Sequence, residues 1–300
     1  MSYHVFYHFP CNDGELSRVI WQKFEPNSFF YKWQHNDHEN EINIINNLST
    51  NSNVVFLDLT PTNDIEKMPN HHKYIIVDHH KNAMLSLVNK KPNLPNYDIL
   101  LYSQKGFPDN NNLSGCKLTW LYFQKDEEYP SVVNYIGDRD VFDFSNPNTE
   151  EYCIGLNHYL KHFDENKRLD YIKELLKTDK NDYTFINIGS HLITEYENEA
   201  MVICNNYSFD KFNELTIIDI KCSNTILYKY LIEHLQQNAI KYNDCDVLRI
   251  LHTEKENQKT YSLRSLKDHI KVDELARHYG GNGHEKAAGY FESHITQFNL

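Results

Sequence analysis

The first half of the chain alternates between two hydrophobic patterns. Short apolar runs rich in β-branched and aromatic residues predict strands at residues 4–9, 28–35, 53–59 and 73–79. Apolar residues at helical spacing predict helices at residues 13–24, 39–48, 115–125 and 129–138. Residues 89–98, rich in Asn, Pro and Lys, predict a loop. Strands that alternate with helices favour an α/β fold with a mostly parallel sheet and helices on both of its faces.

The pattern becomes helical after residue 145 and alternates again after residue 205. Helices with charged faces are predicted at residues 165–177 and 189–207. Beyond them the sequence predicts strands at 214–221, 246–253 and 259–266, with helices at 224–235 and 271–279. We therefore expect three parts: an α/β domain at 1–145, a helical connector at 146–205 and a smaller α/β domain at 206–300.

Composition narrows the class of partner. The chain has 300 residues, of which 40% are hydrophobic, and 42 acidic against 30 basic residues give a formal net charge of −12. Such a balance argues against a long non-specific contact with duplex DNA, which needs clustered Lys and Arg to displace counterions. A short phosphorylated substrate held through metal ions remains compatible with this charge.

Neither a signal peptide nor a membrane-spanning segment is expected. The first residues lack a basic region followed by a long apolar run, and no apolar stretch approaches the roughly 20 residues that cross a bilayer. The six cysteines form no C-x-x-C pair, which favours reduced thiols in the cytoplasm. The sequence does not indicate an oligomeric state.

Acidic and imidazole side chains follow three of the predicted strands. They are His8 and Asp13 after the first strand, Asp58 after the third, and Asp78, His79 and His80 after the fourth, while Asp138 and Asp140 close a later helix. Because ligands bind at the carboxyl ends of strands in open parallel sheets, we expect these groups to gather at one edge. Mixed carboxylates and imidazoles suit Mn²⁺ or Zn²⁺. Two cations about 3.5–4 Å apart that share a carboxylate are a common solution for phosphate ester hydrolysis.

Each of these features alone has a simpler explanation. A single Asp at the end of a strand is most often a turn or helix cap. A second His–His pair, His71 and His72, is interpreted as a solvated loop.

A glycine-rich segment near the C-terminus is a second candidate site. Residues 280–289 read "GGNGHEKAAG", and Gly280, Gly281 and Gly283 would allow the backbone to approach a phosphate closely or to turn sharply. His284 then begins a possible helix whose N-terminus would favour an anion. Arg264, on a predicted strand, could bind phosphate oxygens with its guanidinium group. The alternative is a plain glycine turn with a structural arginine.

Six short motifs together carry a resemblance to a known family. "YIIVDHHK" resembles the third motif of the DHH phosphoesterase superfamily, "HFPCNDG" the first, "VVFLD" the second and "YIGDRD" the fourth. "YSLRS" and "GGNGHEKAAG" are similar to the two motifs of the DHH-associated C-terminal domain. All six stand in the family's order across nearly the whole chain, most like exopolyphosphatase-related and oligoribonuclease-like phosphohydrolases. The resemblance implies a DHH catalytic domain at 1–145 and a substrate-binding domain at 206–300.

The resemblance also implies roles for individual residues. The metal ligands would be His8, Cys11, Asp13, Asp58, His79 and Asp138; the catalytic residues Asp58, His79 and His80; and the substrate-binding residues His80, Arg264, Gly281, Gly283 and His284. Asp78 would orient the histidines. The cofactors would be two divalent cations, Mn²⁺ first, with Zn²⁺, Mg²⁺ or Co²⁺ as alternatives. Cys11 stands where the family's pattern has an acid, so it either ligates as a thiolate or leaves one metal under-coordinated.

The resemblance predicts a metal-dependent phosphohydrolase that cleaves esters of a small substrate with metal-activated water. Candidate substrates are short oligonucleotides, cyclic dinucleotides, 3′-phosphorylated nucleotides and polyphosphate. Two alternatives stay open: a single-strand-specific exonuclease, and a degenerate nucleotide-binding module without catalysis.

Overall fold

A computed structural model of the chain resolves two compact units, Met1–Ser190 and His191–Leu300. It describes residues 2–34, 39–62, 64–80, 83, 86–87, 97–101, 113–125, 128–178, 182–242, 244–255 and 258–293, with the backbone alone at 97–101 and 239–240. Within this part of the chain no helix is both long and apolar enough to span a membrane. The boundary between the units falls inside helix α8 (Asp182–Cys204).

The first unit is built on a five-stranded parallel sheet. Its strands are β1 (Tyr3–His8), β2 (Phe29–Trp33), β3 (Asn53–Leu57), β4 (Lys73–Asp78) and β5 (Tyr97–Leu101), in the order β2-β1-β3-β4-β5. The predicted parallel sheet is thus confirmed. Strand β5 begins inside the stretch predicted as a loop, most of which lies outside the described residues.

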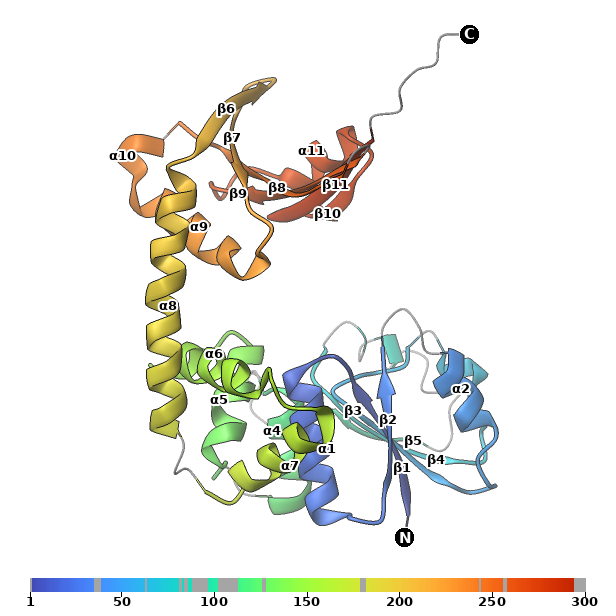
Figure 1. The fold of residues 1–300 in the computed structure, drawn as a ribbon. Helices are drawn as coiled ribbons and strands as arrows, with labels where there is room; N and C mark the ends of the chain where they lie inside the picture. The colour runs from blue at the N-terminus through green and yellow to red at the C-terminus, as the bar shows by residue number, and fades with distance from the viewer. Residues whose placement is uncertain are drawn as a thin grey trace. The chain divides into compact units, whose positions relative to one another are not determined.

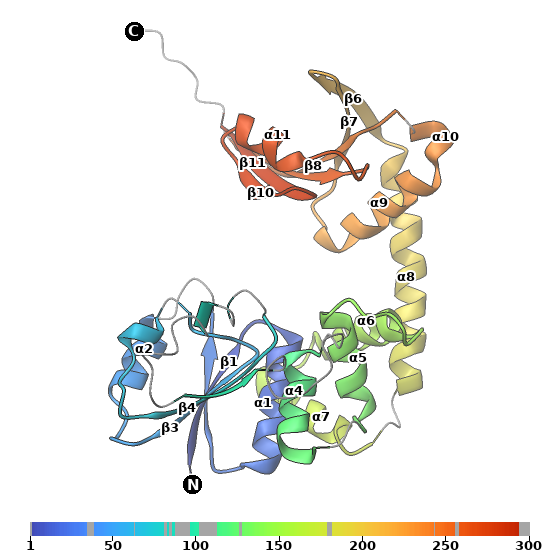
Figure 2. The same ribbon diagram turned by 180° about the vertical axis from the view of Figure 1, so that it is seen from behind.

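Helices cover both faces of this sheet, as predicted (Figures 1 and 2). Helices α1 (Asn12–Phe24) and α4 (Gly115–Gln124) pack on the face that presents Val5 and Tyr7. Helix α2 (Glu39–Asn46) and the short 3₁₀ helix η1 (Ile65–Lys67) pack on the opposite face, against Phe6. Alternate residues of a strand point to opposite faces, so β1 is apolar on both sides.

The interpretation of both His71 and His72 as solvated was wrong for one of them. His72 is fully buried, and its Nε2 lies 3.1 Å from the carbonyl oxygen of Ile45 on α2. His71 is exposed. A loop imidazole thus supplies a hydrogen-bond partner that the end of α2 needs.

A helical layer completes the first unit. It contains α5 (Ser131–Asp140), α6 (Thr149–Leu160), α7 (Glu165–Leu175) and the first part of α8, whose apolar residues form one core with α1 and α4. Helix α6 was not predicted, and the helix expected at residues 189–207 is the second part of the longer α8.

The second unit contains a mixed six-stranded sheet. Its strands are β6 (Tyr207–Phe212), β7 (Leu215–Lys221), β8 (Val247–Lys255), β9 (Gln258–Ser265), β10 (Asn282–His284) and β11 (Ala287–Ser293), in the order β10-β11-β9-β8-β7-β6. Only the β7–β8 pair is parallel among the pairs of this sheet that the structure describes. Its helices are η3 (Thr225–Leu227), α9 (Tyr228–Gln237), α10 (Ala239–Tyr242) and α11 (Val272–His278). The predicted smaller α/β domain is confirmed in its fold class.

The helix predicted after His284 is wrong, because this segment forms the β10–β11 hairpin. Ala288 and Tyr290 are both buried, which is the two-residue period of a strand. Gly281 and Gly283 allow the hairpin to close: a Cβ atom would lie 2.1 Å from the carbonyl oxygen of Gly289 at the first and 2.3 Å from Cα of Ala288 at the second.

Candidate metal centre

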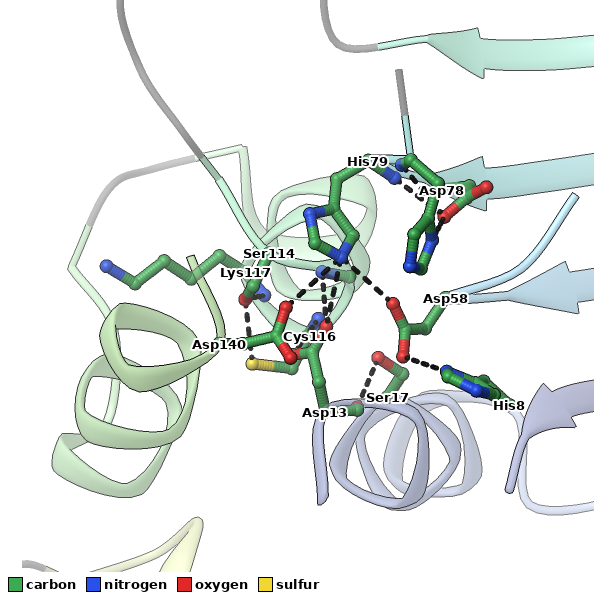
Figure 3. A network of polar contacts seen from close by, with 12 residues as sticks. His8, Asp13, Ser17, Asp58, Asp78, His79, Ser114, Cys116, Lys117 and Asp140 are labelled. Carbon is green, nitrogen blue, oxygen red and sulfur yellow. Dashed lines mark hydrogen bonds and ion pairs between the residues drawn. The ribbon is translucent and has the colours of Figure 1, made fainter. Parts of the chain in front are cut away.

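Three neighbouring strands deliver ionisable side chains to the carboxyl edge of the parallel sheet. His8 ends β1, Asp58 follows β3, and His79 follows β4. Because β1, β3 and β4 are adjacent and parallel, these residues meet at one edge (Figure 3). Asp13, in the first turn of α1, and Asp140, the last residue of α5, approach the same place.

The carboxylate of Asp58 lies between two imidazoles. Its Oδ2 is 3.2 Å from Nδ1 of His8, and its Oδ1 is 3.2 Å from Nε2 of His79. The same Nε2 lies 3.2 Å from Oδ2 of Asp140 and 3.9 Å from Oδ2 of Asp13. Asp58 is thus the group that connects the two histidines.

Possible ligand atoms gather in three overlapping groups, each within 4.8 Å: His8, Cys11 and Asp58; Asp13, His79 and Asp140; and Asp58, Asp78, His79 and His80. Two of these groups share Asp58, and two share His79. The arrangement could therefore accommodate two cations, with the Asp58 carboxylate common to both.

The charges and hydrogen bonds of this cluster fit a divalent cation. Asp58 Oδ1 and His79 Nε2 are buried, and neither makes a hydrogen bond of good geometry to any residue that the structure describes. Burial, together with Asp58 and Asp140, raises the pKa of Asp13 well above its usual range. Burial opposes protonation of His79, but Asp140 and Asp58 outweigh it and raise the pKa of His79 to about 11. A metal ion would supply the positive charge that these carboxylates otherwise draw from protons.

The N-terminus of α4 holds Asp13 in place. The Asp13 carboxylate accepts hydrogen bonds from the backbone N–H groups of Gly115 and Cys116, at 2.6 and 2.9 Å. A Cβ atom on Gly115 would lie 2.7 Å from Cβ of Asp58, so only glycine lets the helix come this close. Sequence reasoning missed Gly115. The available signal was Ser114, which caps the helix and accepts from the Lys117 N–H.

Asp78 contacts the two histidines that follow it. Its Oδ1 accepts from the backbone N–H groups of His79 and His80, at 2.8 and 3.3 Å, and lies 2.7 Å from Nδ1 of His80. Its Oδ2 accepts from the hydroxyl of Thr60 at 2.5 Å. Both oxygens of Asp78 are therefore engaged in fixing the turn after β4.

Asp138 lies elsewhere. It forms a buried ion pair with Lys117 of α4 and belongs to none of the three ligand groups found among the described residues. Asp140, two residues further along α5, is the acid that reaches His79.

The chain shows limited similarity to known proteins. No protein-family model matches it. It is 26% identical over 301 residues to the uncharacterized protein R106 of Acanthamoeba polyphaga mimivirus, with 95% of the chain and 66% of that protein covered. The chain thus spans just under two thirds of the length of this relative.

Solved structures resemble the chain over most of its length. One is the pGpG-specific phosphodiesterase PggH from Vibrio cholerae, with a TM-score of 0.51, 12% identity, and coverage of 97% of this chain and 94% of that one. Another is an exopolyphosphatase-related protein from Bacteroides fragilis, with a TM-score of 0.42, 13% identity, and coverage of 96% and 86%. The chain shares the fold of the phosphodiesterase.

Two of the substrate-binding residues expected in the second unit, Arg264 and His284, lie on β9 and β10, the strands that flank β11. In the sheet register His284 pairs with Ala287, and Ala287 pairs with Arg264, so these residues share one face. The Arg264 guanidinium lies 5.4 Å from the ring centroid of Tyr228 and donates to the carbonyl of Leu263 at 2.8 Å. Arg264 is half-buried, and His284 is exposed.

Replacing each of the two acids of α5 by asparagine distinguishes a role in metal binding from a role in the stability of the fold. We expect Asp140→Asn to weaken Mn²⁺ binding, because it removes a carboxylate oxygen beside His79. We expect Asp138→Asn to lower the free energy of unfolding by about 3–5 kcal/mol, because it leaves Lys117 buried without a counter-charge. Calorimetric titration with Mn²⁺ and urea unfolding in EDTA measure the two effects.

The double variant Lys117→Met/Asp138→Leu serves as the control that should recover stability. Asp138→Asn with normal stability and lost Mn²⁺ binding would contradict this assignment.

Cys11 can be tested by spectroscopy. Burial and the neighbouring Asp58 raise the pKa of its thiol, so the metal-free protein holds the protonated form. A cation bound beside His8 would displace that proton, and Co²⁺ bound to a thiolate gives a charge-transfer absorption band in the near ultraviolet. We expect Co²⁺ to produce this band in the wild type and in Cys116→Ala, but not in Cys11→Ala. A band that survives in Cys11→Ala excludes Cys11 as a ligand.

Proposed function

We propose that the first unit is a two-cation phosphohydrolase of the DHH superfamily that cleaves phosphate esters of a small phosphorylated substrate. The observation that carries this proposal is the buried Asp58 carboxylate, which directs one oxygen toward His8 and the other toward His79. A carboxylate shared in this way is a common bridge between two cations in phosphoester hydrolysis. The shared fold with a protein named as a pGpG-specific phosphodiesterase supports the same chemistry.

The ligand groups divide between two cations. His8 and Cys11 would hold one, Asp13, His79 and Asp140 the other, and Asp58 both. When bound, such cations lower the pKa of water toward neutrality and offset charge on the phosphoryl oxygens. The composition of the first group favours Mn²⁺, Zn²⁺ or Co²⁺ over Mg²⁺, because it contains nitrogen and sulfur.

The chain's own residues would position the substrate. Asp78 raises the pKa of His80 and fixes its Nδ1, which directs Nε2 away from Asp78. In the protonated ring, which this shift favours, Nε2 would donate to a phosphoryl oxygen. In the second unit, Arg264 and His284 share a face of the sheet and would bind a further phosphate. Gly281 and Gly283 would contribute by closing the hairpin that carries His284. Oligonucleotides of a few residues, cyclic dinucleotides, 3′-phosphorylated nucleotides and polyphosphate all carry the anionic groups that these residues require.

Asp58→Asn tests the centre directly. Asp58 has φ of 56°, a left-handed conformation that Asn adopts as readily as Asp, so the variant should fold. We expect the wild type with Mn²⁺ to hydrolyse bis-p-nitrophenyl phosphate, and Asp58→Asn to lose several orders of magnitude in turnover. Mn²⁺ should also raise the melting temperature of the wild type, because ligand binding stabilises the native state, and it should do so less in the variant.

The control for this experiment is Asp170→Asn, which removes an exposed acid on α7 and should leave both measurements unchanged. Hydrolysis by the wild type that persists in excess EDTA, or near-normal turnover by Asp58→Asn, would refute the two-cation centre.

Arg264→Ala tests the second unit. A charge-assisted hydrogen bond contributes about 1.5–3 kcal/mol, so we expect KM to rise by roughly ten- to a hundredfold for a substrate with a second phosphate. Bis-p-nitrophenyl phosphate has no second phosphate and should be affected little. Arg277→Ala, on the surface of α11, is the matched control. Equal losses with both substrates would assign Arg264 a structural role.

A further inference from the structure

The turn that follows α5 exposes two aromatic rings a few residues after Asp140, an acid of the candidate metal centre. Phe142 is 75% exposed and Phe144 is 46% exposed. Phe142 follows Asp140, which contacts His79, by only two residues. Two peptide units span at most about 7.6 Å between Cα atoms, so the backbone at Phe142 stays within that distance of the backbone at Asp140.

The backbone of this turn takes a form that disfavours phenylalanine. The N–H of Asp143 donates to the carbonyl of Asp138 at 2.8 Å, and that of Phe142 donates to the carbonyl of Arg139 at 3.4 Å. This pair of bonds is the Schellman motif, which places Phe142 at the left-handed position normally occupied by glycine. Its φ is 56°, an unfavourable value for a bulky residue. Folding alone would therefore prefer glycine here, and burial gives no reason for the ring.

A cation accompanies both rings. The guanidinium carbon of Arg139 lies 5.9 Å from the ring centroid of Phe142 and 5.8 Å from that of Phe144. The Asp143 carboxylate accepts from the N–H of Ser145 at 3.0 Å and fixes the turn between the two rings. Two aromatic faces and one positive charge are thus held together on a short, hydrogen-bonded segment.

We propose that Phe142 and Phe144, with Arg139, form a binding site for a nucleobase of the substrate, an inference that rests on the function proposed above. Exposed aromatic faces beside a guanidinium are the features on which nucleobases stack, and such stacking tolerates any base. Arg139 also complements the negative charge of a nucleotide. An inorganic polyphosphate has no flat face to stack, so this site selects a nucleotide or short oligonucleotide among the candidate substrates.

Phe142→Gly is the decisive variant, because it removes the ring and relieves the backbone at the same time. Glycine adopts positive φ without strain, so the melting temperature should stay the same or rise. The substrates are a 5′-phosphorylated diribonucleotide and the same compound with both bases replaced by hydrogen. We expect the wild type to have the lower KM for the base-bearing compound, and Phe142→Gly to reduce that preference by about tenfold or more, the loss typical of one base–aromatic stack.

Phe29→Ala is the matched control. Phe29 is 54% exposed and pairs with His4 at the start of β2, whereas the candidate centre lies at the other end of the sheet. This variant should keep the wild-type preference for the base-bearing compound. Phe144→Ala should reduce the preference as Phe142→Gly does.

Binding measurements separate this inference from the function on which it rests. Each compound is also prepared with a non-hydrolysable phosphonate linkage and titrated calorimetrically into the Mn²⁺-loaded proteins. Tighter binding of the base-bearing analogue to the wild type but not to Phe142→Gly supports the base site. Failure of the wild type with Mn²⁺ to hydrolyse both bis-p-nitrophenyl phosphate and these compounds would refute the proposed hydrolase without changing that binding result. Hydrolysis of both compounds with an unchanged preference in Phe142→Gly would refute the base site and leave the hydrolase intact.

Discussion

The first unit is organised around one buried carboxylate, that of Asp58, which is 1% exposed and lies between two imidazoles. Asp13 and Asp140 add two more carboxylates within 4 Å of the same His79 nitrogen. Burying such a group costs several kcal/mol per ion unless an opposite charge compensates it. The surrounding backbone is nevertheless shaped to hold the buried carboxylate. Asp58 adopts a left-handed backbone, and Gly115 leaves space for its side chain. A fold that concentrates negative charge in this way is suited to a multivalent cation.

The sequence predicted the part of this arrangement that depends on parallel strands and on the residues that follow them. Apolar runs ended by acids and imidazoles identified β1, β3 and β4, and a parallel sheet necessarily brings their carboxyl ends to one edge. His8, Asp58 and His79 were accordingly found together. The β10–β11 hairpin was missed because closely spaced glycines occur in turns, in hairpins and at the starts of helices alike. Only the packing of Ala288 and Tyr290 distinguishes among them.

Helix geometry explains why the acids of α5 could not be assigned from sequence. Residues two apart on a helix point about 200° away from each other, so Asp138 and Asp140 cannot serve the same site. Which of them faces His79 depends on how α5 is rotated against α4. That rotation is set by contacts distant in sequence: the ion pair between Asp138 and Lys117, and the close approach at Gly137, where a Cβ atom would lie 2.7 Å from Oγ of Ser114.

Three residues with different roles therefore lie within five positions at the end of α5. Asp138 fixes the helix to α4, Asp140 reaches the candidate centre, and Phe142 presents a ring from the cap that ends the helix. Because these residues share one rigid backbone, the buried ion pair sets the position of both the acid beside His79 and the exposed ring. In the function proposed here, a shift of α5 against α4 would then displace a metal ligand and the base site together. Chemistry and substrate selection would thus depend on the same helix contact, because the ion pair with the buried Lys117 of α4 and the strained phenylalanine cap both lie at this end of α5.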